Sequence, residues 1–475
     1  MGYIAAAINK HGKDTSQTIL QMLRAASPRP ASSIGIADHK NSENSKSPDF
    51  TSHEGPILLG SKNVFSQDYP PAPLHQGDHS MVFKGIFLDT QEPDSFSAAN
   101  ALFKNPVKGV ESLISERTGA YAVAAVTENS VVAGVDHIGT VPLYYGENKD
   151  TGAIASNKKM LWAIGIEPYP LKPGQLIRIT EKETRIQQIK TLENPVPSAS
   201  TVETLNQIMN RTSEEYANTT PRVTVAFSGG IDSLLTAYYL QQNNVRLELI
   251  WSGLEKQQEP YIAQEAADHL GLRLHIDTHT HDEADQVLDN IIASTEEPDP
   301  VKTGIAYPFH WASSKTRELG YTTMYSGNGA DELFGGYMKY LEKYLSGGDP
   351  SEDLYSDVAN SYLNNFHRDT KTCLDQDIRL LLPFTHPRLV DYALSIPITQ
   401  KLPDIREQPR KKILRELAIK LDIPEKLAYR PKKAAQYSSG VNKALSQIAK
   451  KKGMNLRALT NLRYDEWRKG LISRE

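Results

Sequence analysis

Residues 223–240 read VTVAFSGGIDSLLTAYYL, and this stretch decides how the second half of the chain folds. A short apolar run leads into the loop Ser228-Gly229-Gly230-Ile231-Asp232-Ser233, and an apolar helical face follows. Two adjacent glycines let a backbone approach an anion closely, and the N–H groups of such a loop and of the next helical turn point at it. Because Asp232 would repel a bare phosphate, it predicts a divalent cation on that phosphate. The alternative is a glycine-rich strand–helix turn without a ligand.

Strand and helix patterns alternate around this loop. Strands are expected over 222–227, 246–251, 273–276 and 321–325, and helices over 233–242, 259–270 and 308–319. Such alternation predicts a parallel α/β sheet with crossover helices. After Leu333 the helical segments dominate, as at 387–394 and 409–421, so a helical tail is expected.

A second glycine-rich loop follows the strand expected at 321–325. Residues 324–340 read MYSGNGADELFGGYMKY, in which Ser326, Gly327 and Asn328 open the loop. It would lie at the carboxyl edge of the same sheet, where open α/β sheets bind ligands. Asp331 and Asp232 would then face one triphosphate through Mg²⁺. The plain alternative is a helix N-terminus with favourable acidic residues.

The first two hundred residues have a different character. Short β-type runs at 119–126, 130–135 and 175–179 predict a sheet-rich domain. The segment 193–204, ENPVPSASTVET, is rich in Pro and Ser and predicts an interdomain linker. Residues 28–53 are rich in Ser, Asn and Pro, so most of this region is expected to be a surface loop.

Composition narrows the classes of protein further. The 475 residues include 53 Lys and Arg against 57 Asp and Glu, a formal net charge of −4, which carries no global nucleic-acid or membrane signature. The single cysteine, Cys373, excludes an intramolecular disulfide framework and a multi-cysteine metal cluster. No window approaches ~18 uncharged apolar residues, and MGYIAAAINKHGKD is a poor secretion signal. A cytoplasmic protein is expected.

Together the two loops resemble a known family. SGGIDS followed by SGNGADELFGGY at 326–337 resembles the synthetase domain of the asparagine synthetase family, which includes β-lactam synthetases and lasso-peptide cyclases. Other families with an SGGxDS loop lack the second motif. The resemblance continues in short segments: Arg368-Asp369, 382–384, 389–394, 410–415 and 430–441.

The resemblance implies roles for particular residues. ATP would place its phosphates at 228–233, with Mg²⁺ on Asp232 and Asp331. Backbone contacts to adenine would come from Trp251, Ser252, Gly253 and Leu254. One lysine of the pair Lys432 and Lys433 would be catalytic, and the sequence leaves open which of them it is.

The N-terminal half resembles the glutaminase domain of the same family. Residues 119–145, ending VDHIGTVPLYY, and 171–174 match its motifs and imply an αββα sandwich. However, Gly2 stands where an active enzyme has its nucleophilic cysteine. Arg29-Pro30-Ala31 lacks the acid, and Lys84-Gly85-Ile86-Phe87 lacks the Asn and Glu, of the glutamine-holding motifs. This domain is therefore expected not to hydrolyse glutamine.

These features lead to one expectation and two alternatives. Residues 1–192 would form an inactive glutaminase-like domain, 193–204 a linker, and 205–475 an ATP-pyrophosphatase domain. The whole would be an ATP-dependent amide-forming ligase that adenylates a carboxylate and joins it to an amine. Asn328 stands where ammonia-using members have a glutamate, and an amide cannot act as a general base. Ammonia-dependent asparagine synthesis and a non-catalytic scaffold remain alternatives, and a homodimer stays open.

Other clusters have plainer interpretations. His275, His279 and His281 follow a strand, where such residues more often line a polar loop than bind a metal. The basic residues at 410–412 and 432–433 are more typical of a solvated or phosphate-facing helix than of a nucleic-acid site. The acidic residues at 296, 297 and 299 either help to hold the acceptor or form a solvated turn, and Tyr337 and Tyr340 lie close enough to the second loop to line its pocket.

Overall fold

The computed structural model describes residues 2–27, 29–46, 53–63, 72–90, 92–431 and 435–472. The chain divides into two compact units, Met1–Thr191 with Asp465–Glu475, and Leu192–Tyr464. Helix α5 (Val202–Ala217) takes up the last residues of the segment expected to be a linker. Helix α20 (Leu456–Ile472) begins in the second unit, and its final turns belong to the first. The sequence pattern did not predict this return of the chain.

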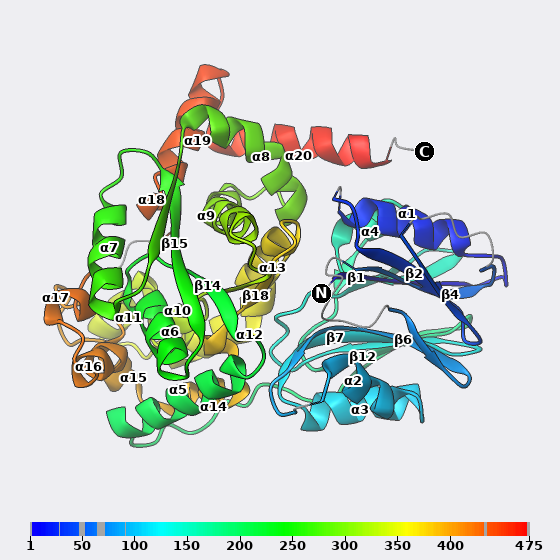
Figure 1. The fold of residues 1–475 in the computed structure, drawn as a ribbon, viewed down its shortest axis with the longest axis horizontal. Coiled ribbons are helices and arrows are strands. Elements are labelled where there is room, and N and C mark those ends of the chain that lie inside the picture. Colours follow the sequence, from blue (N-terminus) through cyan, green and yellow to red (C-terminus); the bar gives the residue numbers. More distant parts are fainter. Residues whose placement is uncertain are drawn as a thin grey trace. The chain divides into compact units, whose positions relative to one another are not determined.

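The first unit has four layers, and its two sheets are antiparallel (Figure 1). Helices α1 (Ser16–Ala26) and α4 (Lys158–Trp162) pack on one sheet, and α2 (Asp94–Leu102) and α3 (Pro106–Glu116) pack on the other. In spatial order the first sheet runs β11 (Tyr169–Pro170), β9 (Tyr144–Glu147), β10 (Thr151–Ala155), β1 (Gly2–Asn9), β4 (Ile57–Asn63), β2 (Ser33–Ala37) and β3 (Ser42–Ser45). The second runs β13 (Thr184–Gln188), β12 (Gln175–Ile179), β8 (Val131–Val135), β7 (Gly119–Val126), β6 (His79–Phe87) and β5 (Leu74–Gln76).

The apolar core of this unit lies between the two sheets. Ile4, Ala6 and Ile8 of β1 alternate toward it, as the two-residue period of a strand requires. They meet alternate residues of β7 and β8, so each sheet buries one face against the other. A second apolar cluster joins the opposite face of β6 and β7 to α2 and α3. The predicted αββα sandwich is confirmed.

The expectation of a surface loop over 28–53 is wrong for its central part, because β2 and β3 form a hairpin there. The turn is built by Asp38, whose Oδ1 accepts hydrogen bonds from the N–H groups of Lys40 at 2.6 Å and Asn41 at 2.7 Å. Strand β2 also pairs with β4. The hairpin is short and mostly polar, which is why its composition resembles that of a loop.

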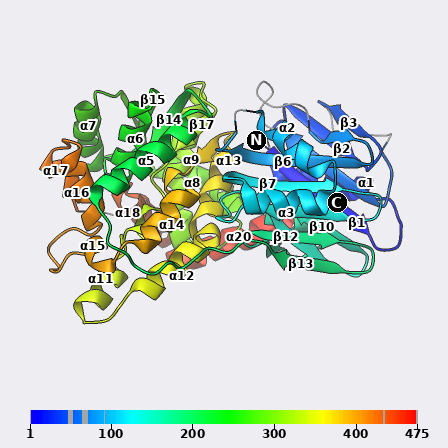
Figure 2. The same ribbon diagram turned by 90° about the horizontal axis from the view of Figure 1, so that it is seen from below.

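The second unit is built on a parallel sheet, as predicted. Its spatial order is β16 (Leu274–His279), β15 (Arg246–Leu254), β14 (Arg222–Ala226), β17 (Thr323–Tyr325) and β18 (Arg379–Leu381). Helices α6 (Ile231–Gln242) and α7 (Glu259–Leu270) cover one face, while α9 (Pro300–Glu318) packs on the other with α8 (His281–Thr295) beside it (Figures 1 and 2). The class predicted for this half, a parallel α/β sheet with crossover helices, is confirmed.

Helix α9 begins earlier than the sequence pattern predicted. The helix expected over 308–319 begins at Pro300, because Asp299 Oδ1 accepts hydrogen bonds from the N–H groups of Val301 and Lys302, both at 2.8 Å. Proline is favoured in a first turn, where its missing N–H costs nothing. Pro308 lies inside the helix.

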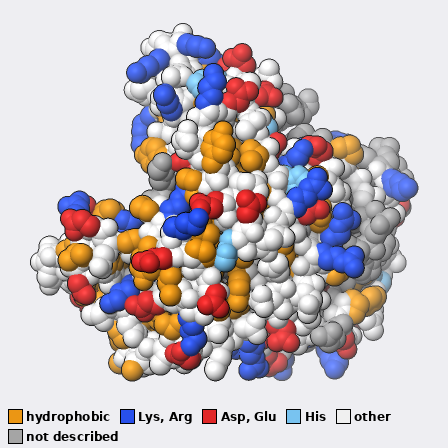
Figure 3. Space-filling model, turned by 60° about the vertical axis from the view of Figure 1, so that its left-hand side comes forward, with side chains coloured by type: hydrophobic (Ala, Val, Ile, Leu, Met, Phe, Trp, Pro, Cys, Tyr) orange, Lys and Arg blue, Asp and Glu red, His pale blue; other side chains and the backbone are white. Residues whose placement is uncertain are grey.

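After α9 the second unit is built mainly of helices. They are α10 (Ala330–Leu333), α11 (Met338–Leu345), α12 (Ser351–Ser361), α13 (His367–Leu374), α14 (Pro387–Ser395), α15 (Ile398–Lys401), α16 (Lys412–Lys420), α17 (Glu425–Ala428), α18 (Ala435–Ser438) and α19 (Val441–Lys451). Within the described ranges, no helix is both long enough and apolar enough to cross a bilayer. On the face drawn in Figure 3, acidic and basic side chains are interspersed.

Candidate functional site

The two glycine-rich loops meet where the strand order of the parallel sheet changes direction. The chain moves from β14 outward to β15 on one side and later returns to β17 on the other. Such a switch point leaves a crevice beyond the carboxyl ends of the two strands. The loops that leave β14 and β17 line one cavity there, with a volume of about 400 Å³. A Cβ on Gly327 would lie 2.7 Å from the carbonyl carbon of Asp232, so only glycine allows the loops to come this close.

The first loop is shaped by hydrogen bonds of its two serines, Ser228 and Ser233. Ser233 Oγ accepts a hydrogen bond from the Ser228 N–H at 3.3 Å and donates to the Gly230 carbonyl at 3.1 Å. Ser228 Oγ accepts from the Gly230 N–H at 3.2 Å. In the described structure, no side chain caps the N-terminus of α6. An uncapped helix N-terminus can bind an anion through its first N–H groups.

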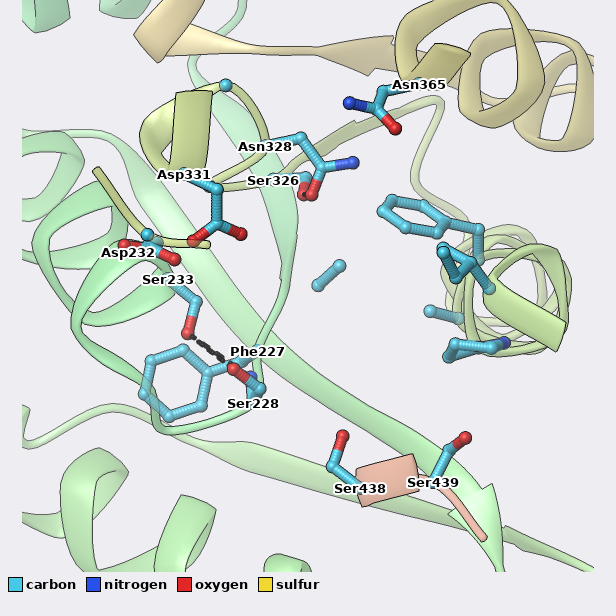
Figure 4. A pocket seen from close by; sticks show the side chains of 18 of the residues that line it. Phe227, Ser228, Asp232, Ser233, Ser326, Asn328, Asp331, Asn365, Ser438 and Ser439 are labelled. Atoms are coloured by element: carbon cyan, nitrogen blue, oxygen red, sulfur yellow. Dashed lines mark hydrogen bonds between the residues drawn. The ribbon is translucent and has the colours of Figure 1, made fainter. Parts of the chain in front are cut away.

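Two carboxylates converge on one lysine beside this loop. Lys411 Nζ lies 2.5 Å from Asp232 Oδ1 and 2.8 Å from Asp331 Oδ1, and the lysine side chain is 1% exposed. Burial lowers the pKa of Lys411, and the charge of Asp232 opposes that shift. Lys411 has a left-handed backbone, with φ of 66°, directly before α16. Figure 4 shows Asp232 and Asp331 on the same side of the cavity.

Asn328 has a structural partner that the sequence did not reveal. Its Nδ2 donates to Asp369 Oδ2 at 2.5 Å, and Ser326 Oγ donates to its Oδ1 at 3.1 Å. Asp369 is fully buried and also accepts from Arg368 Nε at 2.7 Å and Nη2 at 2.8 Å. Burial raises the pKa of Asp369, whereas Arg368 and Asn328 lower it. Asn328 therefore satisfies a buried carboxylate next to the cavity.

A second buried carboxylate lies at the same end of the cavity. Glu332 Oε1 accepts hydrogen bonds from Tyr337 Oη and, at 2.7 Å, from Asn365 Nδ2. Burial raises the pKa of Glu332, and the Tyr337 hydrogen bond lowers it. All three residues line the cavity. This end therefore offers polar groups for a substrate other than the nucleotide.

The opposite end is formed by β15 where it extends beyond β14. The last pair between these strands is Ala226 with Ile250, and the Phe227 N–H donates to the Ile250 carbonyl at 2.8 Å. In a parallel ladder, alternate residues point their peptide groups to the same neighbour. The peptide groups of Ser252 therefore face the cavity beyond the end of β14. Leu254, two residues further, already bonds through its N–H to the Ser439 carbonyl at 2.8 Å.

The structure brings most of the predicted site residues together. Those that line the cavity are Ser228, Asp232, Ser233, Trp251, Ser252, Ser326, Gly327, Asn328 and Asp331. Gly230 and Ile231 instead line an adjoining cavity of about 300 Å³, together with the basic side chains of Arg406, Arg410, Lys411, Arg415 and Arg430. Gly229, Gly253 and Leu254 are not among the residues lining either cavity. Lys432 and Lys433 lie outside the described residues.

Lys411 is the main residue that the sequence analysis missed. It appeared there only within a basic run and a matching segment, without a role. Its position directly before a helix in that segment was the available signal. Tyr337 lines the cavity as expected, whereas Tyr340 bonds through its hydroxyl to Asp357 and is not among the lining residues.

The other candidate clusters have structural partners. Glu296 and Lys371 form a buried ion pair at 2.7 Å, Glu297 pairs with Lys302, and Asp299 caps α9. None of these three acidic residues is among the residues that line the cavity. His275 pairs with Glu248 at 2.5 Å and His279 with Asp277 at 2.8 Å. Among the described residues, no group of three or more His, Cys, Asp or Glu side chains could hold a metal ion.

The first unit has no room for a nucleophile at residue 2. A Cβ on Gly2 would lie 2.2 Å from the carbonyl oxygen of Lys62 and 3.0 Å from Lys84 Nζ. Lys84 is 5% exposed and donates to Asn63 Oδ1 at 2.6 Å. Burial lowers the pKa of Lys84 to about 7. A buried amine thus lies beside the position where the resemblance expects a catalytic thiol.

Both halves of the chain are similar to known proteins. The asparagine synthase family matches residues 205–377 and 346–460, and a glutamine amidotransferase domain family matches residues 90–163. A Methanocaldococcus jannaschii protein, provisionally named asparagine synthetase (glutamine-hydrolysing) 1, is 29% identical over 73% of each chain. Asparagine synthetase B of Escherichia coli is 25% identical over 68% of this chain and 60% of its own length. Human asparagine synthetase is 28% identical over 50% of this chain and 43% of its own.

Proposed function

Because this chain belongs to the asparagine synthase family, we propose that it is an ATP-dependent ligase that activates a carboxylate and forms an amide. The observation that carries the proposal is that one cavity is lined by Ser228, Asp232 and Ser233 of the first loop, by residues 326–329 of the second loop and by Asp331. The carboxylates of Asp232 and Asp331 converge there on one ammonium group. A non-catalytic scaffold would not need this arrangement of glycines and charges.

The two aspartates fit a divalent cation that arrives with the nucleotide. Both already lie within 2.8 Å of one ammonium group, so their oxygens point at a common cation position. Mg²⁺ is usually held by one or two carboxylates together with substrate phosphates and water. Asp232 and Asp331 would hold it, and it would neutralise charge on the polyphosphate. Lys411 would then be free to turn toward a phosphate oxygen.

The reaction we propose has two steps. First, a carboxylate oxygen of the substrate attacks the α-phosphorus of ATP, the bond from that phosphorus to the bridging oxygen breaks, and pyrophosphate leaves. Second, an amine attacks the acyl carbon, AMP leaves with the bonding electrons, and the nitrogen loses a proton. The N–H groups at the start of α6 and the ammonium of Lys411 would stabilise the charge on the departing pyrophosphate. Asn328 has no group that can take up the proton.

The adenine ring fits the end of the cavity formed by β15. There the N–H and carbonyl groups of Ser252 face the cavity, and they offer one donor and one acceptor to a base edge. The acid would lie at the opposite end, near Asn328, Glu332 and Asn365. The phosphate loop lies between the two ends, so this order places the α-phosphorus beside the acid.

We propose that the amine is not produced from glutamine by this chain. Any side chain at residue 2 would collide with the Lys62 carbonyl, and Lys84 fills the space beside it. Incubation with glutamine should therefore release no glutamate above background, whether or not ATP and a carboxylic acid are present. Steady release of glutamate would contradict this part of the proposal.

Asparagine synthesis from free ammonia is the second candidate. The family relationship favours it, but a glutamate at position 328 would lie beside the buried carboxylate of Asp369. The polar end of the cavity is thus built around an amide, which favours a different nitrogen donor.

ATP–pyrophosphate exchange tests the proposed function. Labelled pyrophosphate is supplied with Mg²⁺, ATP and pools of carboxylic acids, beginning with aspartate. Exchange that depends on one acid is expected, and it should fall at least tenfold in Asp331→Asn. The control Asp353→Asn changes a carboxylate of α12 that pairs with Lys343 of α11, and it should leave the exchange unchanged. If no acid supports exchange, the proposed activity is wrong.

A further inference from the structure

A polar triad lies on the sheet beside the proposed adenine position. Ser252 Oγ donates a hydrogen bond to Asp277 Oδ2 at 3.1 Å, and His279 Nε2 lies 2.8 Å from the same oxygen. His279 is held in turn by Trp311 of α9, because the two rings stack with centroids 4.2 Å apart and planes at 11°. The carboxylate of Asp277 is therefore fixed by its neighbours.

The triad faces the cavity side of the sheet. Ser252 and Asp277 are direct partners in the parallel pairing of β15 and β16, and His279 follows Asp277 by two residues. Their side chains therefore share one face of the sheet, and the stacking on Trp311 shows that this face is the one covered by α9. Ile305, Pro308, Phe309 and Ala312 of α9 line the cavity together with Ser252. A purine ring in this cavity would lie between α9 and Ser252.

The direction of the Ser252 hydroxyl is determined by its partner. An ionised carboxylate accepts hydrogen bonds and donates none, so the single hydroxyl hydrogen of Ser252 is used on Asp277. Only the lone pairs of Ser252 Oγ remain for a ligand. The hydroxyl can therefore accept from an amino group, and it meets a carbonyl oxygen unfavourably.

We propose that Ser252, oriented by Asp277, selects the base of the nucleotide by accepting a hydrogen bond from the 6-amino group of adenine. Ser252 is the specificity-determining residue and Asp277 is a positioning residue. This inference rests on the proposed function, because it concerns the ATP site of that reaction. It adds a side-chain contact to the backbone contacts of Ser252, which remain in any variant at this position.

The test compares three nucleotides that differ only at position 6 of the base. Calorimetry with Mg²⁺ measures binding of ATP, of purine riboside triphosphate, which lacks the amino group, and of inosine triphosphate, which carries an oxygen. One hydrogen bond between neutral groups corresponds to about three- to tenfold in affinity. Wild-type protein should bind ATP more tightly than purine riboside triphosphate by at least this factor, and inosine triphosphate more weakly still.

Variants separate the side chain from the backbone. In Ser252→Ala the preference for ATP over purine riboside triphosphate should fall by about three- to tenfold. In Asp277→Asn the amide can donate to Ser252, which frees the hydroxyl hydrogen, so the preference for ATP over inosine triphosphate should shrink. Thr278→Ala, an exposed change on the same strand, should leave both ratios unchanged. Thermal melts of each variant report whether the fold is intact.

The outcomes distinguish this inference from the proposed function. If Ser252→Ala keeps the full wild-type preference, the backbone alone selects the base and the inference is wrong. If wild-type protein binds all three nucleotides equally, only the inference fails. A wild-type protein that binds none of them overturns the proposed function and this inference with it.

Discussion

Replacement of Lys411 by methionine removes the charge between the two aspartates while keeping an unbranched side chain one atom shorter. The lysine is almost completely buried, whereas the Asp232 and Asp331 side chains are 21% and 18% exposed. Breaking a fully buried pair costs about 3–5 kcal/mol and an exposed pair at most ~1 kcal/mol. For these partly solvated carboxylates we expect a loss of about 2–3 kcal/mol.

This loss of folding free energy is measurable as a decrease of the melting temperature. In a unit of this size 1 kcal/mol corresponds to about 2–4 °C, so Lys411→Met should melt about 4–12 °C lower in metal-free buffer. The two aspartates are then left without their cation and should bind Mg²⁺ in the absence of nucleotide. At ten times its dissociation constant, bound metal restores about 1.4 kcal/mol. Wild-type protein, whose aspartates already hold a cation, should gain little.

The matched control is Lys412→Met, the same change at the next residue, which begins α16 and forms no ion pair with either aspartate in the described structure. Differential scanning fluorimetry with and without 10 mM MgCl₂ compares the three proteins. If Lys411→Met melts with wild type, or shows no greater response to Mg²⁺ than Lys412→Met, the reasoning is refuted.

Three further changes test other parts of the structure. Asn328→Asp replaces a donor to Asp369 by a second carboxylate, so one of the two carboxyl groups must hold a proton in the folded protein and its pKa is raised. A pKa that is raised on folding makes the folded state lose stability as pH rises, so the variant should melt at a lower temperature at pH 8 than at pH 6. The same melting temperature at both pH values would contradict the contact between residue 328 and Asp369. Burial lowers the pKa of Lys84 from its ordinary value of 10.5 to about 7, so between pH 7 and 9 the lysine holds a proton in the unfolded chain but largely not in the folded one. The free energy of unfolding of the first unit should therefore rise by about 2–3 kcal/mol over this range. Denaturant titrations measure this rise, and Lys84→Met should abolish it. Gly327→Ala would place a methyl group 2.7 Å from the backbone of Asp232 and should lower the free energy of unfolding by about 1–3 kcal/mol. The variant should also lose nucleotide binding, which calorimetry measures. If it binds ATP as tightly as the wild-type protein does, the two loops can separate and the argument is wrong.

The fold was largely predictable because its signals are local. Hydrophobic runs of strand length, alternating with helical segments, indicated the parallel sheet around β14, and glycines after two strands indicated its ligand edge. The errors also have local causes. The helix expected over 308–319 begins instead at Pro300, because Asp299 caps α9 one residue before it. The hairpin of β2 and β3 was missed because it is short and polar.

The site was predictable only where one motif carries it. Asp232 and Asp331 were found because each belongs to a glycine-rich loop after a strand. Lys411 was not given a role, because its partner Asp232 lies far away in the sequence and only tertiary packing brings them together. The same reason hid the contact between Asn328 and Asp369. No pattern of spacing along the chain reports such pairs.

Transfer of oxygen from the acid to AMP tests the central claim most directly. The acid that supports pyrophosphate exchange is labelled with ¹⁸O in its carboxylate and incubated with ATP, Mg²⁺ and an amine, and AMP is analysed by mass spectrometry. Attack of the carboxylate on the α-phosphorus predicts one ¹⁸O atom in each AMP that accompanies an amide. Amide formation with unlabelled AMP, or with ADP in place of AMP, would contradict the account.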